Sequence, residues 1–232
     1  MRFVLFLVLL STQALAMDIK PVGDQLIMSG RINGGELARL RDVLAEYGES
    51  RIHTVILRDS PGGDHWESLR VGEFIRDRGW RTAVSGTCSS GCALMFMGGV
   101  ARHFTDDKPE SQTRVSFHGS YSPVDTLRAR AGGRNWEDTS RSVGWIKERS
   151  DGKLSEALLD RIAMMEKHEF LRFTDPSRTP KAGMPSVFHC VQPEKSLPRK
   201  CDPVEGTDSY REGIITSKVL LRSNDRADAT TR

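Results

Sequence analysis

Three short stretches decide the fold of this chain: Ser60-Pro61-Gly62-Gly63, Cys88-Ser89-Ser90-Gly91-Cys92 and Phe117-His118. They offer a candidate nucleophile, Ser90, a candidate base, His118, and glycine-rich backbone whose N–H groups can hold an oxyanion. Each stretch lies at the start or end of a segment whose sequence pattern is typical of a strand or a helix. Acyl transfer needs all three parts in one pocket, so the fold must bring these stretches together if they act as one site.

The segments around these stretches alternate between strand and helix patterns. Short apolar runs with β-branched residues predict buried strands, and apolar positions spaced i, i+3, i+4 predict helices. The resulting order is a strand over 54–57, a helix over about 64–78, a strand over 82–85, an apolar helix over 93–97 that begins near Ser90, and a strand over 115–118. This order predicts an α/β domain with a mostly parallel sheet, in which chemistry gathers at the carboxyl ends of the strands.

The position of Ser90 favours a catalytic role. A serine at a helix N-terminus lies in the positive end of the helix dipole, and the N–H of Gly91 has no helical acceptor there. Gly63 is the candidate for a second oxyanion donor, and His118 for the group that takes and returns the proton. The plainer alternative is that Ser90 only caps the helix and that His118 is structural.

The combined pattern resembles the proteolytic subunit of Clp proteases, in the ClpP/crotonase superfamily. The resemblance covers residues 52–121 and continues weakly to 210–215. It implies repeated ββα units with a mostly parallel sheet and a helical arm, here over about 128–153, through which the chain forms a homo-oligomer. It also implies that Ser90 is the nucleophile, that His118 is the base, and that Gly63 and Gly91 are the oxyanion donors.

The third member of the implied catalytic triad departs from the family. The family keeps an aspartate in a segment resembling RDxFL, and that position falls on or beside His168. Glu169 is our choice for the acid that orients His118, with Glu166 as the alternative. The missing aspartate also favours a second hypothesis, in which the chain is a catalytically degenerate member of the superfamily.

The N-terminus has the pattern of a signal peptide. An apolar run follows Arg2, and Ala14 and Ala16 supply the small-residue cleavage pattern, which predicts removal of residues 1–16 and an exported, periplasmic or secreted protein. No later stretch is long enough to span a membrane. We expect one domain over 17–221, with an irregular insertion over about 174–208, and a flexible tail over 222–232.

Four cysteines remain after the predicted cleavage, and an even number is typical of disulfides in an oxidising compartment. Three pairings are possible, and we favour Cys190–Cys201 together with Cys88–Cys92. A metal site built from Cys88, Cys92, His103 and His118 is disfavoured, because its spacing matches no common zinc pattern. We therefore predict no metal and no other cofactor.

The net charge and the motifs of the chain exclude several classes of partner and substrate. The formal charge of +3 falls to +2 without Arg2, which indicates no nucleic acid partner. The chain has no phosphate-binding loop, and an exported protein lacks cytosolic ATP, so we expect no ATPase partner. Coenzyme A chemistry is disfavoured because its thioesters are cytosolic. Two hypotheses remain: a serine peptidase or other acyl hydrolase acting on peptides or unfolded proteins, and an inactive ClpP-like scaffold.

Overall fold

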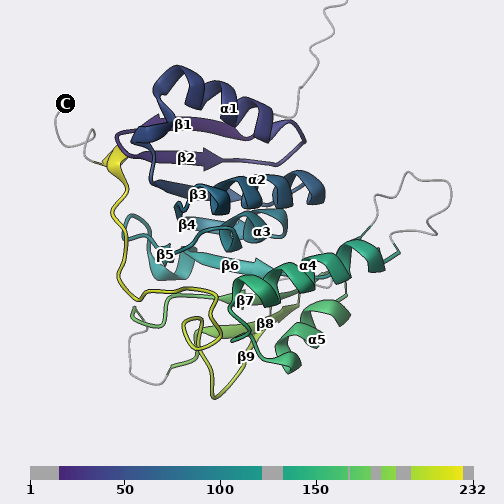
Figure 1. The fold of residues 1–232 in the computed structure, drawn as a ribbon. Coiled ribbons are helices and arrows are strands. Elements are labelled where there is room, and N and C mark those ends of the chain that lie inside the picture. The colour runs from purple at the N-terminus through teal and green to yellow at the C-terminus, as the bar shows by residue number, and fades with distance from the viewer. Residues whose placement is uncertain (1–15, 122–132, 167, 179–183, 192–199, 227–232) are drawn as a thin grey trace, which may run out of the picture.

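One mixed sheet organises the molecule. The computed structural model describes residues 16–121, 133–166, 168–178, 184–191 and 200–226 of the 232-residue chain. Nine strands form the sheet in the order β1-β2-β3-β4-β6-β7-β8-β9, with β5 paired to β4 (Figure 1). The strands are β1 Asp18–Val22, β2 Gln25–Ser29, β3 Thr54–Ser60, β4 Arg81–Ser89, β5 Arg102–Phe104, β6 Arg114–Phe117, β7 Glu169–Phe173, β8 Val187–Val191 and β9 Lys200–Pro203.

Five α-helices in the described residues connect or cover these strands. They are α1 Glu36–Tyr47, α2 His65–Asp77, α3 Gly91–Met97, α4 Trp136–Arg149 and α5 Glu156–Met164. Short 3-10 turns lie at 49–51, 110–112 and 224–226. None of the described helices is long and apolar enough to cross a membrane.

The centre of the sheet is parallel and both of its ends are antiparallel. β2, β3, β4 and β6 run parallel, whereas β1 and the β7-β8-β9 group pair antiparallel to their neighbours. The same edge of β4 has two partners: residues 82–84 pair with β5, and residues 87–89, beyond Gly86, pair with β6. The α/β fold class predicted from the sequence is confirmed, and its parallel part carries the candidate site.

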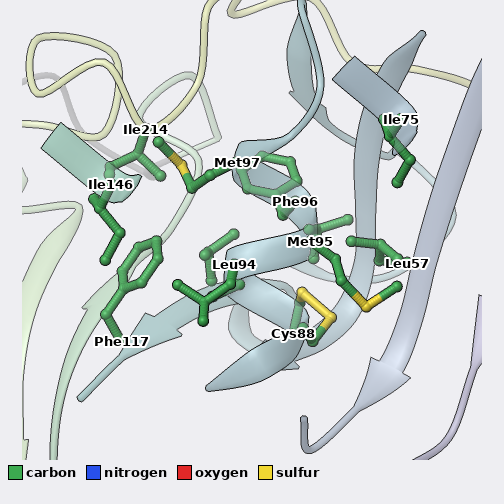
Figure 2. Close-up of a cluster of buried hydrophobic side chains, with 14 of the residues drawn as sticks. Leu57, Ile75, Cys88, Leu94, Met95, Phe96, Met97, Phe117, Ile146 and Ile214 are labelled. Atoms are coloured by element: carbon green, nitrogen blue, oxygen red, sulfur yellow. A yellow bond between two sulfur atoms is a disulfide. The ribbon is translucent and has the colours of Figure 1, made fainter. Parts of the chain in front are cut away.

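Helix α3 forms the middle of the hydrophobic core. All seven of its residues are buried, which explains why its sequence is apolar on every side. Figure 2 shows Met95 and Phe96 within the cluster of buried side chains, and Leu94 beside Phe117 of β6 and Ile146 of α4. The core therefore holds the N-terminus of α3 rigidly against the ends of β4 and β6.

Two predicted irregular segments are ordered where the structure describes them. The insertion over 174–208 contains β8 and β9, which extend the sheet by antiparallel pairing with β7 and with each other. The tail over 222–232 is anchored through residue 226: Ser223 is buried, and Asp225 forms an ion pair with Arg58. Polar contacts of Ser223 and Asp225 with Arg58, rather than apolar residues, hold the described part of this segment. The predicted signal peptide and the remainder of the tail lie outside the described residues, apart from Ala16.

The helical arm expected over 128–153 corresponds to α4. This helix packs against α3, and Trp145 Nε1 donates a hydrogen bond to the Leu94 carbonyl at 3.0 Å. The Trp145 ring also lies against Gly72 of α2, where an added Cβ would be only 3.1 Å from the ring. As a result, α4 lies beside α3, near the ends of β4 and β6, and forms one wall of a cavity there (Figure 1).

Candidate active site

A cavity of about 610 Å³ opens where α2, α3 and β6 meet α4. Ser90, His118, Gly63 and Gly91, the four residues that the sequence singled out, all line it. Its apolar lining comes from several elements: Ile32, Trp66, Leu94, Phe117 and Ile146. The mixed lining suits a peptide, which has both an apolar and a hydrogen-bonding surface.

Ser90 occupies a tight turn between β4 and α3. Its φ of +56° lies in the region that favours glycine, so the surrounding contacts must hold it there. Its N–H donates to the Ser116 carbonyl at 2.9 Å, which joins the turn to β6. Its hydroxyl makes no capping hydrogen bond to α3. The plain helix-cap role considered from the sequence therefore does not describe this side chain.

Two glycine segments pack directly against this turn. A Cβ atom on Gly62 would lie 2.7 Å from Gly91 N and 2.8 Å from Ser90 Cβ, so only glycine fits. A Cβ on Gly91 would lie 3.4 Å from Gly63 N, which places the two candidate oxyanion donors on neighbouring backbone. Neither the Gly63 nor the Gly91 N–H has a backbone acceptor in the described part of the chain. This lack of a backbone partner is what an oxyanion-binding role requires.

His118 follows β6 directly and packs between two aromatic rings. Tyr121 stacks on it at 6.4 Å between ring centroids, and Phe170 meets it edge-on at 5.2 Å. Its Nδ1 lies 2.5 Å from the Gly119 carbonyl oxygen, which assigns the ring proton to Nδ1 and leaves the lone pair on Nε2. Burial lowers the pKa of His118, against a smaller opposing effect of the Gly119 hydrogen bond, so the ring is neutral at pH 7.

Glu169 lies on β7 with other partners. Its Oε2 accepts a hydrogen bond from Glu166 N at 2.7 Å, and its Oε1 lies 3.6 Å from His189 Nε2 on β8. Among the described residues, no carboxylate lies within ion-pair distance of His118. The assignment of Glu169 as the orienting acid therefore rests on the sequence alone. The antiparallel pairing of β7 with β8 brings Glu169 to His189 instead.

Both favoured disulfides are present. Cys88 on β4 is joined to Cys92 on α3, with 5.2 Å between their Cα atoms, so the bridge spans the Ser90 turn. Cys190 on β8 is joined to Cys201, its register partner on β9. Because Cys88 and Cys92 are bonded to each other, they present no thiolates to a metal. The described residues contain no cluster of three or more metal-ligating side chains.

Sequence reasoning missed part of the cavity. His65 of α2 and two residues of α4, Asp138 and Ser142, line the wall next to the glycine segment. His65 follows the Ser60–Asp64 stretch directly, so its position was a usable signal. Asp138 and Ser142 are one helical turn apart on α4, but no local pattern links them to His65, because only tertiary packing places α4 beside α2.

Comparison with solved structures agrees with this architecture, whereas comparison by sequence gives no match. No protein-family model and no curated protein matches the sequence. Among solved structures, a mutant of ClpP1 from Listeria monocytogenes matches 87% of this chain and 93% of its own, with a TM-score of 0.52 and 11% identity. The chain has a ClpP-like fold. A mutant of the 1510-N membrane-bound stomatin-specific protease matches 88% of this chain and 80% of its own, with a TM-score of 0.51 and 9% identity. At these identities the likeness shows the fold alone.

Proposed function

We propose that this chain is an exported serine peptidase, or a related acyl hydrolase, that acts on peptides or loosely folded proteins. The observation that carries the proposal is the turn at Ser90. Its hydroxyl is free of α3, the N–H groups of Gly63 and Gly91 have no backbone acceptor among the described residues, and His118 lines the same cavity. A helix cap alone needs neither these N–H groups nor the histidine.

In the proposed reaction, His118 Nε2 takes the proton of the Ser90 hydroxyl as Oγ bonds to the substrate carbonyl carbon. The carbonyl oxygen becomes an oxyanion and accepts hydrogen bonds from the N–H groups of Gly63 and Gly91. The protonated His118 then gives its proton to the leaving amine, and the C–N bond breaks. Water repeats the sequence on the acyl-enzyme and releases the acid and free Ser90.

The Gly119 carbonyl takes the position that a carboxylate occupies in a full triad. It holds the His118 tautomer in which Nε2 is free, but it carries no full negative charge to stabilise the imidazolium. Loss of the charged partner costs about 10⁴ in rate in a serine protease. We therefore expect a slow hydrolase that works as a Ser-His dyad.

Export and self-association complete the proposal. Two disulfides and the signal-peptide pattern of residues 1–16 support a periplasmic or secreted location. Trp136 at the start of α4 is 55% exposed and Met164 at the end of α5 is 62% exposed. Arg134 contacts both side chains, so they belong to one exposed area, and contiguous exposed apolar areas are typical of interaction surfaces. We therefore expect a homo-oligomer that uses these helices. We expect no ATPase partner.

The second candidate function is an inactive ClpP-like scaffold. It is favoured by one observation, the absence of a carboxylate beside His118 in the described residues. In this case the disulfide at 88–92 would serve only to stiffen the cavity for binding a partner.

Covalent labelling separates the two functions. We expect a fluorophosphonate probe to modify the mature chain, residues 17–232, at Ser90. Ser90→Ala should abolish the label, whereas Ser89→Ala is the matched control and should keep most of it. Labelling that survives Ser90→Ala would show that another residue is the nucleophile. The absence of labelling in the wild-type chain in every oligomeric state would support the scaffold.

A further inference from the structure

A second polar cluster lines the cavity wall formed by α2 and α4. His65 is the first residue of α2, and its ring lies between Ser142 and Asp138 of α4. Its Nδ1 is 3.4 Å from Ser142 Oγ, and its Nε2 is 3.9 Å from Asp138 Oδ1. The proposed hydrolysis uses none of these three side chains, although they share the cavity with Ser90.

The cluster has unused hydrogen-bonding capacity. His65 Nε2 is buried and has no hydrogen-bond partner in the described chain. Asp138 Oδ2 accepts a hydrogen bond from Asn135 Nδ2 at 2.8 Å, whereas Oδ1 lies 3.9 Å from His65 Nε2, beyond hydrogen-bond length. Buried polar groups are almost always paired, so an unpaired one on a cavity wall indicates a ligand group that pairs with it.

The protonation state of His65 indicates which kind of ligand group would pair with it. Burial lowers the pKa of His65, so the ring is neutral at pH 7. In the neutral tautomer in which Nδ1–H donates to Ser142 Oγ, His65 presents a lone pair at Nε2, and a cation bound beside Asp138 favours this tautomer. Nε2 and Asp138 Oδ1 are then two acceptors 3.9 Å apart. A nitrogen about 2.8 Å from each would see them at an angle of roughly 90°, which two N–H bonds of one ammonium can serve.

The charges around the cluster favour a cation. Two carboxylates flank His65 along the cavity lining, Asp64 and Asp138. Arg31 also lines the cavity, but its side chain is exposed to solvent. Arg141, which is near His65, stacks on Trp66 with its guanidinium 4.4 Å from the ring centroid and lines a neighbouring hollow instead.

We propose that His65 and Asp138 form a specificity subsite for the positively charged side chain, lysine or arginine, of a peptide substrate. The proposal rests on the proposed function, since it supplies the substrate class of that site. Asp138 provides the charge and one acceptor, His65 provides the second acceptor, and Ser142 orients the His65 ring.

Peptide binding to the inactive variant tests the subsite without relying on catalysis. The probe is a set of fluorescein-labelled alanine heptapeptides, each with one position occupied by lysine or by norleucine, its uncharged counterpart. Fluorescence anisotropy on the Ser90→Ala chain measures each dissociation constant. We expect lysine at one position to bind about tenfold tighter than norleucine, the size of one charge-assisted hydrogen bond.

Variants of the cluster assign the effect. Asp138→Asn should remove most of the lysine preference, and His65→Gln is a second variant should the first fail to fold by circular dichroism. Glu137→Gln, a charge change on the same helix outside the cavity lining, should keep the preference. A preference that survives in Asp138→Asn and in His65→Gln, or no binding of any lysine peptide, overturns the subsite. A lysine preference in a chain that no fluorophosphonate labels overturns the hydrolase and leaves the subsite standing.

Discussion

The Nδ1 atom of His118 lies 2.5 Å from the carbonyl oxygen of Gly119. This contact gives His118 a partner from its own backbone, where the ClpP-like pattern led us to expect a carboxylate from a distant segment. A backbone carbonyl sets the tautomer of the ring as a carboxylate does, but it adds no full charge. The burial of the ring then controls its pKa, because little opposes the loss of hydration.

The pH dependence of Ser90 labelling should report this environment. His118 acts as a base only when neutral, and burial lowers its pKa below the ordinary 6.5. The labelling rate should therefore be level from neutral pH into mildly acidic pH and fall only below the lowered pKa. Stopped time courses over about pH 4 to 8 measure the midpoint. A midpoint above 6.5 would mean that a negative group reaches the ring.

Replacing Glu169 tests the acid that the sequence suggested. Because its carboxylate contacts Glu166 N and lies near His189, we expect Glu169→Gln to keep labelling and hydrolysis within about twofold of the wild type. Glu166→Gln, at an exposed position, tests the alternative acid in the same way, and we expect it to be equally mild. A steep loss confined to Glu169→Gln would show that this carboxylate moves to His118 during catalysis, as the resemblance implied.

The two disulfides should differ in their effect on activity. Removing either bridge should lower the free energy of unfolding by about 2–4 kcal/mol. Only the Cys88→Ala/Cys92→Ala variant should also slow Ser90 labelling, because that bridge spans the strained turn. Cys190→Ala/Cys201→Ala is the matched control, since its bridge lies between β8 and β9. Denaturant titration and labelling rates give the two quantities, and equal slowing in both variants would reduce the first bridge to a stability role.

Replacing Gly62 with alanine should distort the Ser90 turn, although Gly62 is not part of that turn. Gly62 has φ +88°, and its added Cβ would clash with Ser89 O at 2.4 Å and with Gly91 N at 2.7 Å. Gly206 has φ +80° with no atom of the described residues within 4 Å of its added Cβ, so Gly206→Ala carries the backbone cost alone, about 1 kcal/mol. Gly62→Ala should cost more stability and abolish labelling, as thermal unfolding and the probe would show. Normal labelling in Gly62→Ala would separate this glycine from the site.

The sequence by itself determined the local features of this protein. The β-branched run at 54–57, the apolar run at 93–97 and the glycines around Ser90 each specify their structure through short-range rules of burial, periodicity and allowed φ. Those rules were enough to predict the α/β class and the place of Ser90 at the start of α3. They missed the strands at 187–191 and 200–203 and the contacts that anchor 222–226, because polar and proline-rich composition carries no strand pattern there.

Only the tertiary structure decided which groups meet. The order of the strands brings Ser90 and His118 to one cavity, while the register of β7 with β8 leads Glu169 to His189. The packing of α4 against α3 places Asp138 beside His65. These contacts depend on strand register and on packing between segments far apart in the chain. A shift of one residue along a strand turns a side chain to the opposite face of the sheet. No local sequence pattern can therefore specify these contacts.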